Sequence, residues 1–409
     1  MAFTQTINGT PLDDELTGAD EGDDFIFGRG GNDRLVGFGR HDHLFGGPGD
    51  DSLFGENGSD WLNGGPGADV LDGGTGFDLA DYGNSRAGVT VTLSAGAGTG
   101  TGGGAHGDTL TRVEGLYGSA FGDILIGGRG VQSLAGLGGD DLLSGGNHAD
   151  ILDGGGGDDN LAGEAGDDLL QGGAGSDAID GGDGFDMAAY YGAAALVDML
   201  RPERNTGDAG GDSLTGVEGL YGSDFADTLL GDHGDNRING NGGDDVLNGR
   251  GGNDVLRGGG AGDRMFGGAG DDVFEGGGGM LNGGAGSDVL NVSLGHFLEY
   301  DGQRMRGGEG ADVFHTDPVD RTVVRIVDFE PDIDTLDLVL GYGELPAGPL
   351  DAGRFALGTA AADADDRLVY DAATGRLWFD ADGSGTGSDP ILFAILTNHA
   401  SLSAADIVI

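Results

Sequence analysis

The sequence predicts an all-β protein, a parallel β-roll or β-helix solenoid of nine-residue repeats that is closed by a C-terminal antiparallel β cap. Three observations predict this fold. Glycine supplies 94 of the 409 residues, far above its usual share. Aspartates recur at nine-residue steps over long stretches. The last part of the chain loses the repeat and gains β-branched residues.

The repeat has the form G-G-x-G-x-D-x-U-x, where U is a large apolar residue, and its aspartates form three runs. The first run comprises Asp24, Asp33, Asp42, Asp51, Asp60, Asp69 and Asp78. The second comprises Asp123, Asp141, Asp150, Asp159, Asp168, Asp177 and Asp186, with Gln132 in place of one aspartate. The third comprises Asp227, Asp245, Asp254, Asp263 and Asp272, with Asn236 in place of one aspartate. Beyond it the pattern becomes irregular, and Asp288 and Asp312 head isolated units.

Each unit is expected to form a six-residue turn followed by a three-residue strand. Glycine suits the turn because its residues must adopt positive φ, which is costly for a residue with a Cβ. The U residue points inward and its neighbours point outward. Two units make one coil, and stacked coils bury a core that no single unit can bury. A flexible acidic polymer, the interpretation that composition alone favours, would not keep one residue type in phase.

The stacked aspartates create an electrostatic problem. Equivalent loops repeat every 18 residues, so carboxylates lie about 5 Å apart and repel by about 3 kcal/mol per pair at an effective dielectric of 20. One apolar side chain per unit supplies about 2 kcal/mol. A divalent cation between the loops converts the repulsion into ligation, and an all-oxygen site suits calcium. Two alternatives are exposed aspartates without an ion and a halophilic protein that needs only salt.

These units resemble the RTX family, the hemolysin-type calcium-binding repeats of proteins exported by bacterial type I secretion, over most of residues 14–315. The resemblance implies a β-roll of nonapeptide calcium-binding repeats. It implies ligation of Ca²⁺ by the sixth-position aspartates named above and by carbonyls of the second and fourth loop residues. Those loop residues are represented by Gly47, Gly49, Gly65, Gly67, Gly155, Gly157, Gly173, Gly175, Gly268 and Gly270. Gln132 and Asn236 depart from the pattern, and sites there are expected to be weaker or empty.

The number of ions follows from the gaps between loops two units apart. The first run offers five gaps, the second six and the third four, which predicts roughly 15 calcium ions. The loaded protein would remain acidic, because its formal net charge without metal is −52.

Two related inserts separate the runs and suggest a division of the chain. We expect a first ladder at 1–81, an insert at 82–117, a second ladder at 118–189, an insert at 190–221, a third, fraying ladder at 222–315 and a C-terminal region at 316–409. Both inserts end in the words V-E-G-L-Y-G-S. We expect them to continue the coil with larger turns and no metal loops, and a ligand-binding or catalytic insertion is the alternative.

The C-terminal region is expected to cap the open end of the roll. Val323–Phe329 and Leu336–Leu340 are predicted strands, and Leu368–Tyr370 and Leu377–Phe379 flank a hairpin turn. The region resembles the terminal block of RTX exoproteins, which implies an uncleaved signal for the type I secretion machinery. Residues 1–18 show no cleavable signal peptide, in keeping with that route.

Composition and motifs exclude several functions. The scarcity of basic residues argues against nucleic acid as a partner, and no apolar run is long enough to span a membrane. No catalytic motif is recognisable, so a non-enzymatic role is favoured and no catalytic residue is assigned. We therefore expect a secreted, extracellular or cell-surface protein that folds on binding calcium and has a structural or adhesive role. The alternative is an accessory or catalytic module of an extracellular polysaccharide-modifying enzyme, with a cell-surface polysaccharide as candidate partner.

Overall fold

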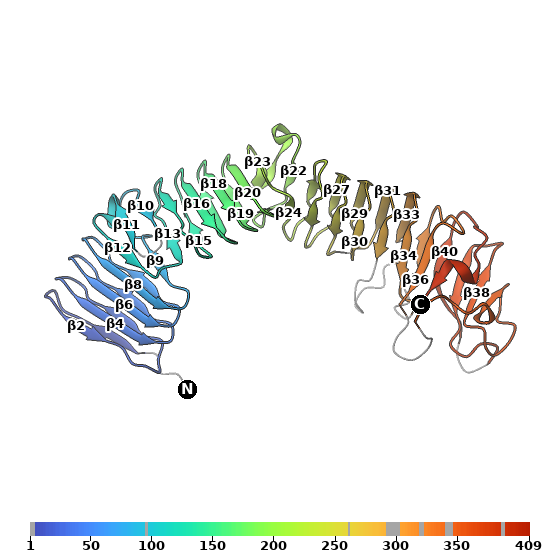
Figure 1. Ribbon diagram of the computed structural model, residues 1–409, viewed down its shortest axis with the longest axis horizontal. Helices are drawn as coiled ribbons and strands as arrows, with labels where there is room; N and C mark the ends of the chain where they lie inside the picture. Colours follow the sequence, from blue (N-terminus) through green and yellow to red (C-terminus); the bar gives the residue numbers. More distant parts are fainter. Residues whose placement is uncertain are drawn as a thin grey trace. The chain divides into compact units, whose positions relative to one another are not determined.

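The computed structural model describes residues 5–94, 97–260, 262–291, 303–318, 323–339, 347–385 and 389–409. Two compact units make up the chain. The first contains Met1–Tyr190 and Asp208–Val217, and the second contains Tyr191–Gly207 and Glu218–Ile409. Within each unit the described residues form strands that stack in parallel (Figure 1). The few helices described are single 3₁₀ turns, and none of them is long and apolar enough to cross a membrane.

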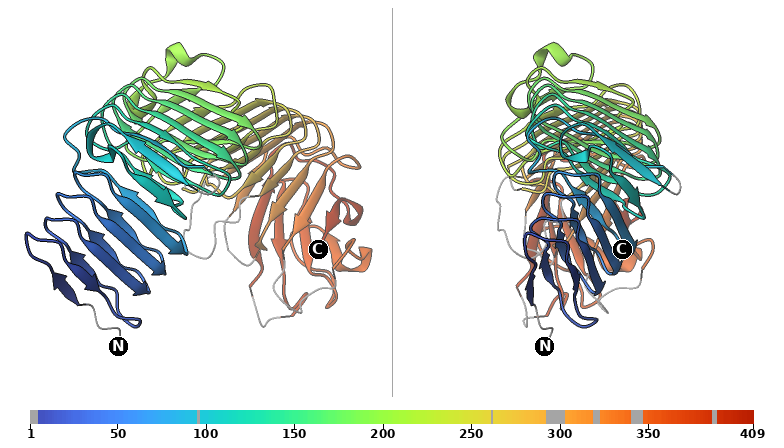
Figure 2. Two further views of the ribbon diagram at one scale, coloured as in Figure 1. Left: turned by 60° about the vertical axis from the view of Figure 1, so that its left-hand side comes forward. Right: turned by 90° about the vertical axis from the view of Figure 1, so that its left-hand side faces the viewer.

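The first unit is a parallel β-roll with one sheet on each of two faces (Figure 2). One sheet runs through β1 (Thr6–Asn8), β3 (Phe25–Phe27), β5 (His43–Phe45), β7 (Trp61–Asn63), β9 (Leu79–Asp81), β13 (Gly115–Tyr117), β15 (Ser133–Ala135), β17 (Ile151–Gly156), β19 (Leu169–Ala174) and β21 (Met187–Ala189). The other runs through β2 (Glu15–Thr17), β4 (Arg34–Gly39), β6 (Ser52–Asn57), β8 (Val70–Thr75), β12 (Thr109–Thr111), β11 (Gly98–Thr101), β10 (Thr90–Thr92), β14 (Ile124–Ile126), β16 (Leu142–Asn147), β18 (Asn160–Ala165), β20 (Ala178–Asp183) and β23 (Ser213–Thr215).

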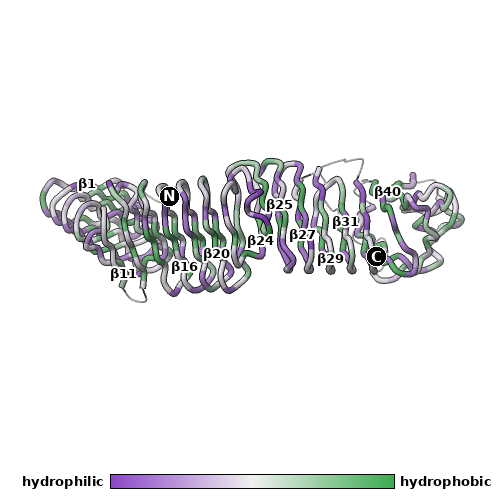
Figure 3. The backbone as a smooth tube through the Cα atoms, turned by 90° about the horizontal axis from the view of Figure 1, so that it is seen from above, coloured by the Kyte–Doolittle hydropathy of each residue, from purple (hydrophilic) through white to green (hydrophobic). Residues whose placement is uncertain are grey.

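The register of the ladders follows the sequence repeat. Leu134 pairs with Leu152, and Leu152 pairs with Leu170, each step being 18 residues. These U residues are fully or almost fully buried, whereas Ile151, one position earlier, is 50% exposed. Apolar residues therefore recur at equivalent places in successive coils (Figure 3). The predicted inward direction of the U residues is confirmed.

The first insert continues the coil with one additional feature. Its strand β12 stacks in parallel on β8, and β13 stacks in parallel on β9. Between β12 and β10 the chain adds β11, which is antiparallel to both neighbours. Strand β10 then restarts the parallel ladder against β14. The longer turn of the insert thus contributes an extra strand without interrupting the roll.

The second unit is also a parallel roll. One face carries β24 (Gly219–Tyr221), β26 (Arg237–Asn239), β28 (Val255–Arg257), β30 (Val273–Glu275), β32 (Val289–Asn291), β34 (Val313–Thr316), β36 (Thr335–Leu338) and β41 (Ile407–Val408). The other carries β22 (Leu196–Asp198), β25 (Thr228–Leu230), β27 (Val246–Gly251), β29 (Arg264–Ala269), β31 (Met280–Ala285), β33 (Arg304–Glu309), β35 (Val324–Ile326), β40 (Ile391–Leu396), β39 (Arg376–Phe379), β38 (Leu368–Asp371) and β37 (Phe355–Leu357).

The C-terminal region closes this roll with mixed pairing. Strand β40 stacks in parallel on β35, and β38–β39–β40 pair antiparallel. The predicted hairpin is present, and the predicted strand Val323–Phe329 is represented by β35. Leu340, the last residue of the other predicted strand, lies outside the described residues. The predicted all-β fold, a parallel solenoid with an antiparallel cap, is confirmed.

Candidate metal centres

The repeat aspartates lie at the end of each turn, immediately before a strand, and form columns along the edges of the roll. Each uses Oδ1 to accept a hydrogen bond from a backbone N–H of the preceding coil, in most cases that of the preceding aspartate in the column. The N–H of Asp141 donates to Asp159 at 2.8 Å, and the N–H of Asp159 donates to Asp177 at 2.9 Å. Side chain and backbone are thereby linked from coil to coil. The carboxylates stack as the sequence predicted.

The second carboxylate oxygen, Oδ2, has no hydrogen-bond partner in most of these aspartates, although the residues are at most 3% exposed. A buried ionised oxygen without a partner is costly, so a ligand is expected there. The aspartates concerned are Asp33, Asp42, Asp51, Asp60, Asp69, Asp78, Asp141, Asp150, Asp159, Asp168, Asp177, Asp245, Asp254, Asp263, Asp272, Asp288 and Asp312.

The glycines of the turn bring carbonyl oxygens close to these carboxylates. A Cβ on Gly154, the first residue of its turn, would lie 2.4 Å from Oδ2 of Asp159 and 2.6 Å from the carbonyl oxygen of Gly172 in the next coil. Both oxygens therefore border the same small space. A set of carboxylate and carbonyl oxygens fits Ca²⁺, which takes six to eight oxygen ligands in flexible geometry.

The predicted second- and fourth-position glycines are required by the close stacking of loops. At Gly157, φ is +135°, and a Cβ would lie 2.1 Å from the carbonyl oxygen of Gly139. At each of the other predicted loop glycines, a Cβ would likewise lie 2.6 Å or less from the carbonyl oxygen of the equivalent residue one coil earlier. These are Gly47, Gly49, Gly65, Gly67, Gly155, Gly173, Gly175, Gly268 and Gly270.

Side chains alone do not make a metal site here. Among the described residues, no three His, Cys, Asp or Glu side chains converge as a group that could hold a metal ion. A cation between two loops would therefore take most of its ligands from backbone carbonyls. This donor set is suited to Ca²⁺ and unsuited to zinc, which prefers nitrogen and sulfur.

Burial has a large effect on the acidity of the columns. It raises the pKa of Asp69 to about 8, and the carboxylates of Asp108 and Asp51 add to the rise. Burial likewise raises the pKa of Asp141, Asp245 and Asp254 to about 7. Without a cation, ionised aspartates at neutral pH would thus be unfavourable in the folded state.

The carboxylates of three of the predicted ligands accept hydrogen bonds from donors of their own turn. The N–H and hydroxyl groups of Ser119 donate to the carboxylate of Asp123, and those of Ser223 donate to Oδ2 of Asp227. Oδ2 of Asp24 accepts from the N–H of Ala19 at 2.7 Å. At the two departures from the repeat, Oδ1 of Asn236 accepts from the N–H of Asp232, while Nε2 of Gln132 donates to the carbonyl of Gly130.

Several column members could not be predicted from the sequence repeat, because they do not fall at the nine-residue steps. Asp108 and Asp212, in the inserts, accept from the N–H groups of Asp69 and Asp177. The sequence had indicated that Asp288 and Asp312 head isolated units, but in the structure they are not isolated. They continue one column from Asp272, at steps of 16 and 24 residues, and Asp334 follows. Asp108 and Asp212 could have been recognised by the D-x-U motif alone, without the nine-residue step.

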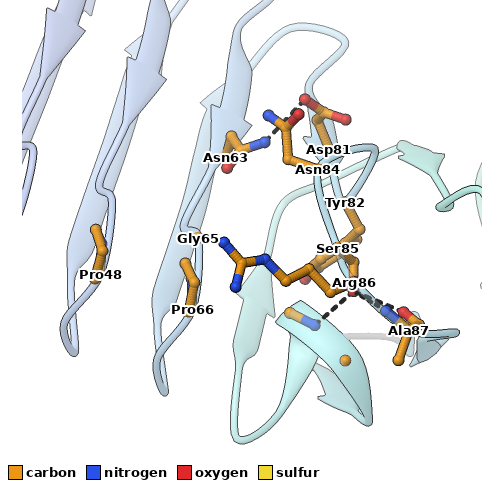
Figure 4. Close-up of a pocket in the computed structure, with 12 residues that line it drawn as sticks. Pro48, Asn63, Gly65, Pro66, Asp81, Tyr82, Asn84, Ser85, Arg86 and Ala87 are labelled. Carbon is orange, nitrogen blue, oxygen red and sulfur yellow. Dashed lines mark hydrogen bonds between the residues drawn. The ribbon is translucent and has the colours of Figure 1, made fainter.

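A pocket of about 640 Å³ lies beside the first insert (Figure 4). Its lining includes Pro66 from a repeat loop together with Asn63, Asp81, Asn84 and Arg86. The side chain of Arg86 extends toward the repeat loop in Figure 4, and it forms no ion pair with a described residue. Asn63 donates to Asp81 across the pocket wall at 3.0 Å.

The parallel β-roll and the carboxylate columns along its edges together define a calcium-binding repeat protein. The sequence model of the family described as RTX calcium-binding nonapeptide repeat (4 copies) matches residues 8–37, 45–80, 126–161, 153–188, 221–256 and 248–279. These segments are RTX calcium-binding nonapeptide repeats.

Comparison with solved structures found the solution structure of the AlgE6R3 subunit from the Azotobacter vinelandii mannuronan C5-epimerase. It is 27% identical, the match covers 46% of this chain and 80% of that chain, and the TM-score is 0.20. The comparison with curated proteins gave no match.

Proposed function

We propose that this protein is a secreted repeat protein whose roll forms when extracellular calcium enters the loop edges, and that it serves a structural, surface-associated or adhesive role. The observation that carries the proposal is the column of buried Oδ2 atoms without hydrogen-bond partners. Each is held beside carbonyl oxygens of glycine turns. Cations there satisfy the orphaned oxygens and cancel the repulsion along the column.

Folding and metal binding are coupled in this proposal. The core contains one apolar side chain per nine residues, and the edges carry uncompensated negative charge when metal is absent. Because the sites exist only when coils stack, the free energy of binding is also free energy of folding. At the submicromolar free calcium of a cytosol the chain stays unfolded, and at millimolar calcium it rolls up. Unfolded export through type I secretion machinery, with the C-terminal region as its signal, is part of the same proposal.

A calcium titration followed by far-UV circular dichroism tests this function. We expect a strand signal that is absent in excess EGTA at low salt and that appears cooperatively as free calcium rises to millimolar. Magnesium and concentrated NaCl serve as controls, because a halophilic fold would need only salt. Strand signal that persists unchanged in EGTA at low salt contradicts the proposal. The Asp351→Ala variant, outside the columns, should titrate like the parent protein.

A second candidate, recognition of an acidic polysaccharide, is favoured by the pocket beside the first insert. Arg86 is a cation without an acidic partner among the described residues, in a protein of net charge −52. Amide groups of Asn63 and Asn84 also line the pocket. A carboxylate-bearing sugar would match the guanidinium and these amides.

Binding of acidic oligosaccharides to the calcium-loaded protein, measured by calorimetry, tests this candidate. Arg86→Ala should weaken binding at least tenfold, while Arg129→Ala, an exposed arginine outside the pocket, should leave it unchanged. Equal binding by both variants would argue against a role for the pocket. A parallel assay for modification of the sugar chain separates a binding module from an enzyme.

A further inference from the structure

The turns that precede the column carboxylates are of two kinds, which differ in backbone conformation. In one kind, here called open, the second residue of the turn has positive φ, as at Gly155 with +97° and Gly173 with +99°. This holds even where the second residue is not glycine, as at Glu164 with +77° and Arg250 with +78°. A non-glycine residue in this region costs about 1–2 kcal/mol, so the open conformation must be stabilised by something else.

In most of the open turns Oδ2 of the carboxylate has no hydrogen-bond partner. Oδ2 of Asp159 is buried with no partner, and Asp141 and Asp254 have the same arrangement. The open turn thus leaves a buried carboxylate oxygen facing the gap between coils.

In the other kind of turn, here called closed, the second residue does not have positive φ and its own N–H donates to the carboxylate. Thr10 donates from N–H and hydroxyl to Asp14, at 2.5 and 2.9 Å. Ser119 and Ser223 do the same for Asp123 and Asp227. The sequence motif G-[ST]-x-x-x-D is common to all three turns. Their carboxylates are satisfied without a cation, which would have to displace existing donors.

Each column of a run begins with a closed turn or, at Gln132, with an uncharged side chain. Asp14 precedes the first run and Asp24 begins it. The second residues before Gln132 and Asn236 also lack positive φ, and at Asn236 the N–H of that residue donates to the side chain. Gln132 keeps an unpartnered Oε1, but it carries no charge. The gaps next to these closed turns therefore have one satisfied or uncharged side, unlike the gaps within a run.

At the C-terminal end of the last column, open turns continue beyond Asp272, where the nine-residue repeat ends. Gly284 and Gly308, the second residues of the turns before Asp288 and Asp312, have φ of +124° and +115°. Both aspartates are at most 1% exposed and have an unpartnered Oδ2. At Asp334 the turn is closed again, because the N–H of Glu330 donates to Oδ2 at 2.7 Å.

We propose that only gaps between two open turns bind calcium, and that the closed turns are metal-free ends of each column. This rests on the proposed calcium binding and specifies where it occurs. The gaps that end at the insert carboxylates Asp108 and Asp212 are not counted, because the second residues of their turns, Gly104 and Asp208, lack positive φ. Two gaps in each of the four columns of the first unit, one gap in the column from Asp245 to Asp263 and three in the column from Asp254 to Asp312 then give about twelve ions. Five gaps counted from the repeat spacing are excluded. The gaps Asp272–Asp288 and Asp288–Asp312 are added.

Native mass spectrometry at saturating calcium tests the proposal with matched variants. Asp288→Ala should lower the number of bound ions by two, because its carboxylate borders two open gaps. Asp123→Ala, in a closed turn, should leave the number at that of the parent protein, about twelve. Circular dichroism in calcium checks that both variants fold, and Asp227→Ala provides a second closed-turn variant should Asp123→Ala fail to fold.

The outcomes separate this proposal from the general one. A parent protein that binds no calcium would remove the proposed function itself. A calcium-loaded parent with about 15 ions, with loss of an ion in Asp123→Ala or Asp227→Ala, would overturn the two-turn proposal alone. Retention of all ions in Asp288→Ala would do the same.

Discussion

The glycine at each loop position is fixed by a neighbouring carbonyl as much as by its own dihedral angles. In the turn before Asp159, Gly157 has φ of +135° and no space for a Cβ, whereas Gly156 has open space and no positive φ. The repeat consensus reflects this difference, since its third position is variable. Stacking, and not turn formation alone, therefore determines which glycines the loop needs.

These two adjacent glycines give a matched pair of substitutions. We expect Gly157→Ala to destabilise the calcium-loaded protein by about 2 kcal/mol or more, through both the dihedral penalty and the clash with Gly139. Gly156→Ala should change stability by less than about 1 kcal/mol. Urea unfolding at fixed free calcium measures both. Equal effects would mean that loops are not stacked as described.

The sequence revealed most column residues because they keep a fixed phase. It could not reveal which carboxylates already have donors, since Ser119 becomes a donor to Asp123 only through the conformation of the turn. It also missed Asp108 and Asp212, whose distance from the preceding column member is set by the length of an insert. Periodicity identifies residues, and three-dimensional register assigns their partners.

At the scale of elements, most strands of the repeats contribute one inward side chain to a narrow core. On β17, Leu152 is fully buried and its neighbour Ile151 is 50% exposed. The strand pattern was predictable, because a period of two leaves only one residue of three pointing inward. The additional antiparallel strand β11 was not, because Gly98–Thr101 is a Gly-Thr segment without an apolar alternation.

Alanine substitution of Leu152 and of Ile151 compares the stability contribution of a core side chain with that of a surface side chain. Leu152→Ala should cost about 2–5 kcal/mol, since it removes a buried side chain and leaves a cavity. Ile151→Ala should cost less than about 1 kcal/mol, because its side chain is already half in solvent. The unfolding midpoint in saturating calcium reports both. A larger loss for Ile151→Ala would indicate an inverted strand register.

For the whole molecule, the raised pKa values predict an unusual pH dependence of the metal-free state. Folding raises the pKa of Asp141 from 3.8 to about 7 and that of Asp69 to about 8, chiefly through burial. The folded state therefore binds more protons than the unfolded state between these values. The resulting stabilisation is fully present below about pH 4, decreases as the pH rises above that value and is lost at about pH 7 to 8.

In excess chelator we thus expect strand signal to be strongest near pH 4 and to decline toward pH 8. With calcium present the trend reverses, because protons compete with the ion for the same carboxylates and weaken its binding below about pH 6. Circular dichroism across pH 4–8, with EGTA or with calcium, measures both profiles. A metal-free profile that gains strand content with rising pH would contradict the burial of ionised aspartates.

The folded roll depends on cations lying between stacked carboxylates, and anomalous diffraction from crystals grown in calcium examines this most directly. We predict calcium peaks between successive coils, within ligand distance of Oδ2 of Asp159 and the facing turn carbonyls, and none beside Asp123. Well-ordered coils with no anomalous peak along either edge would contradict the account.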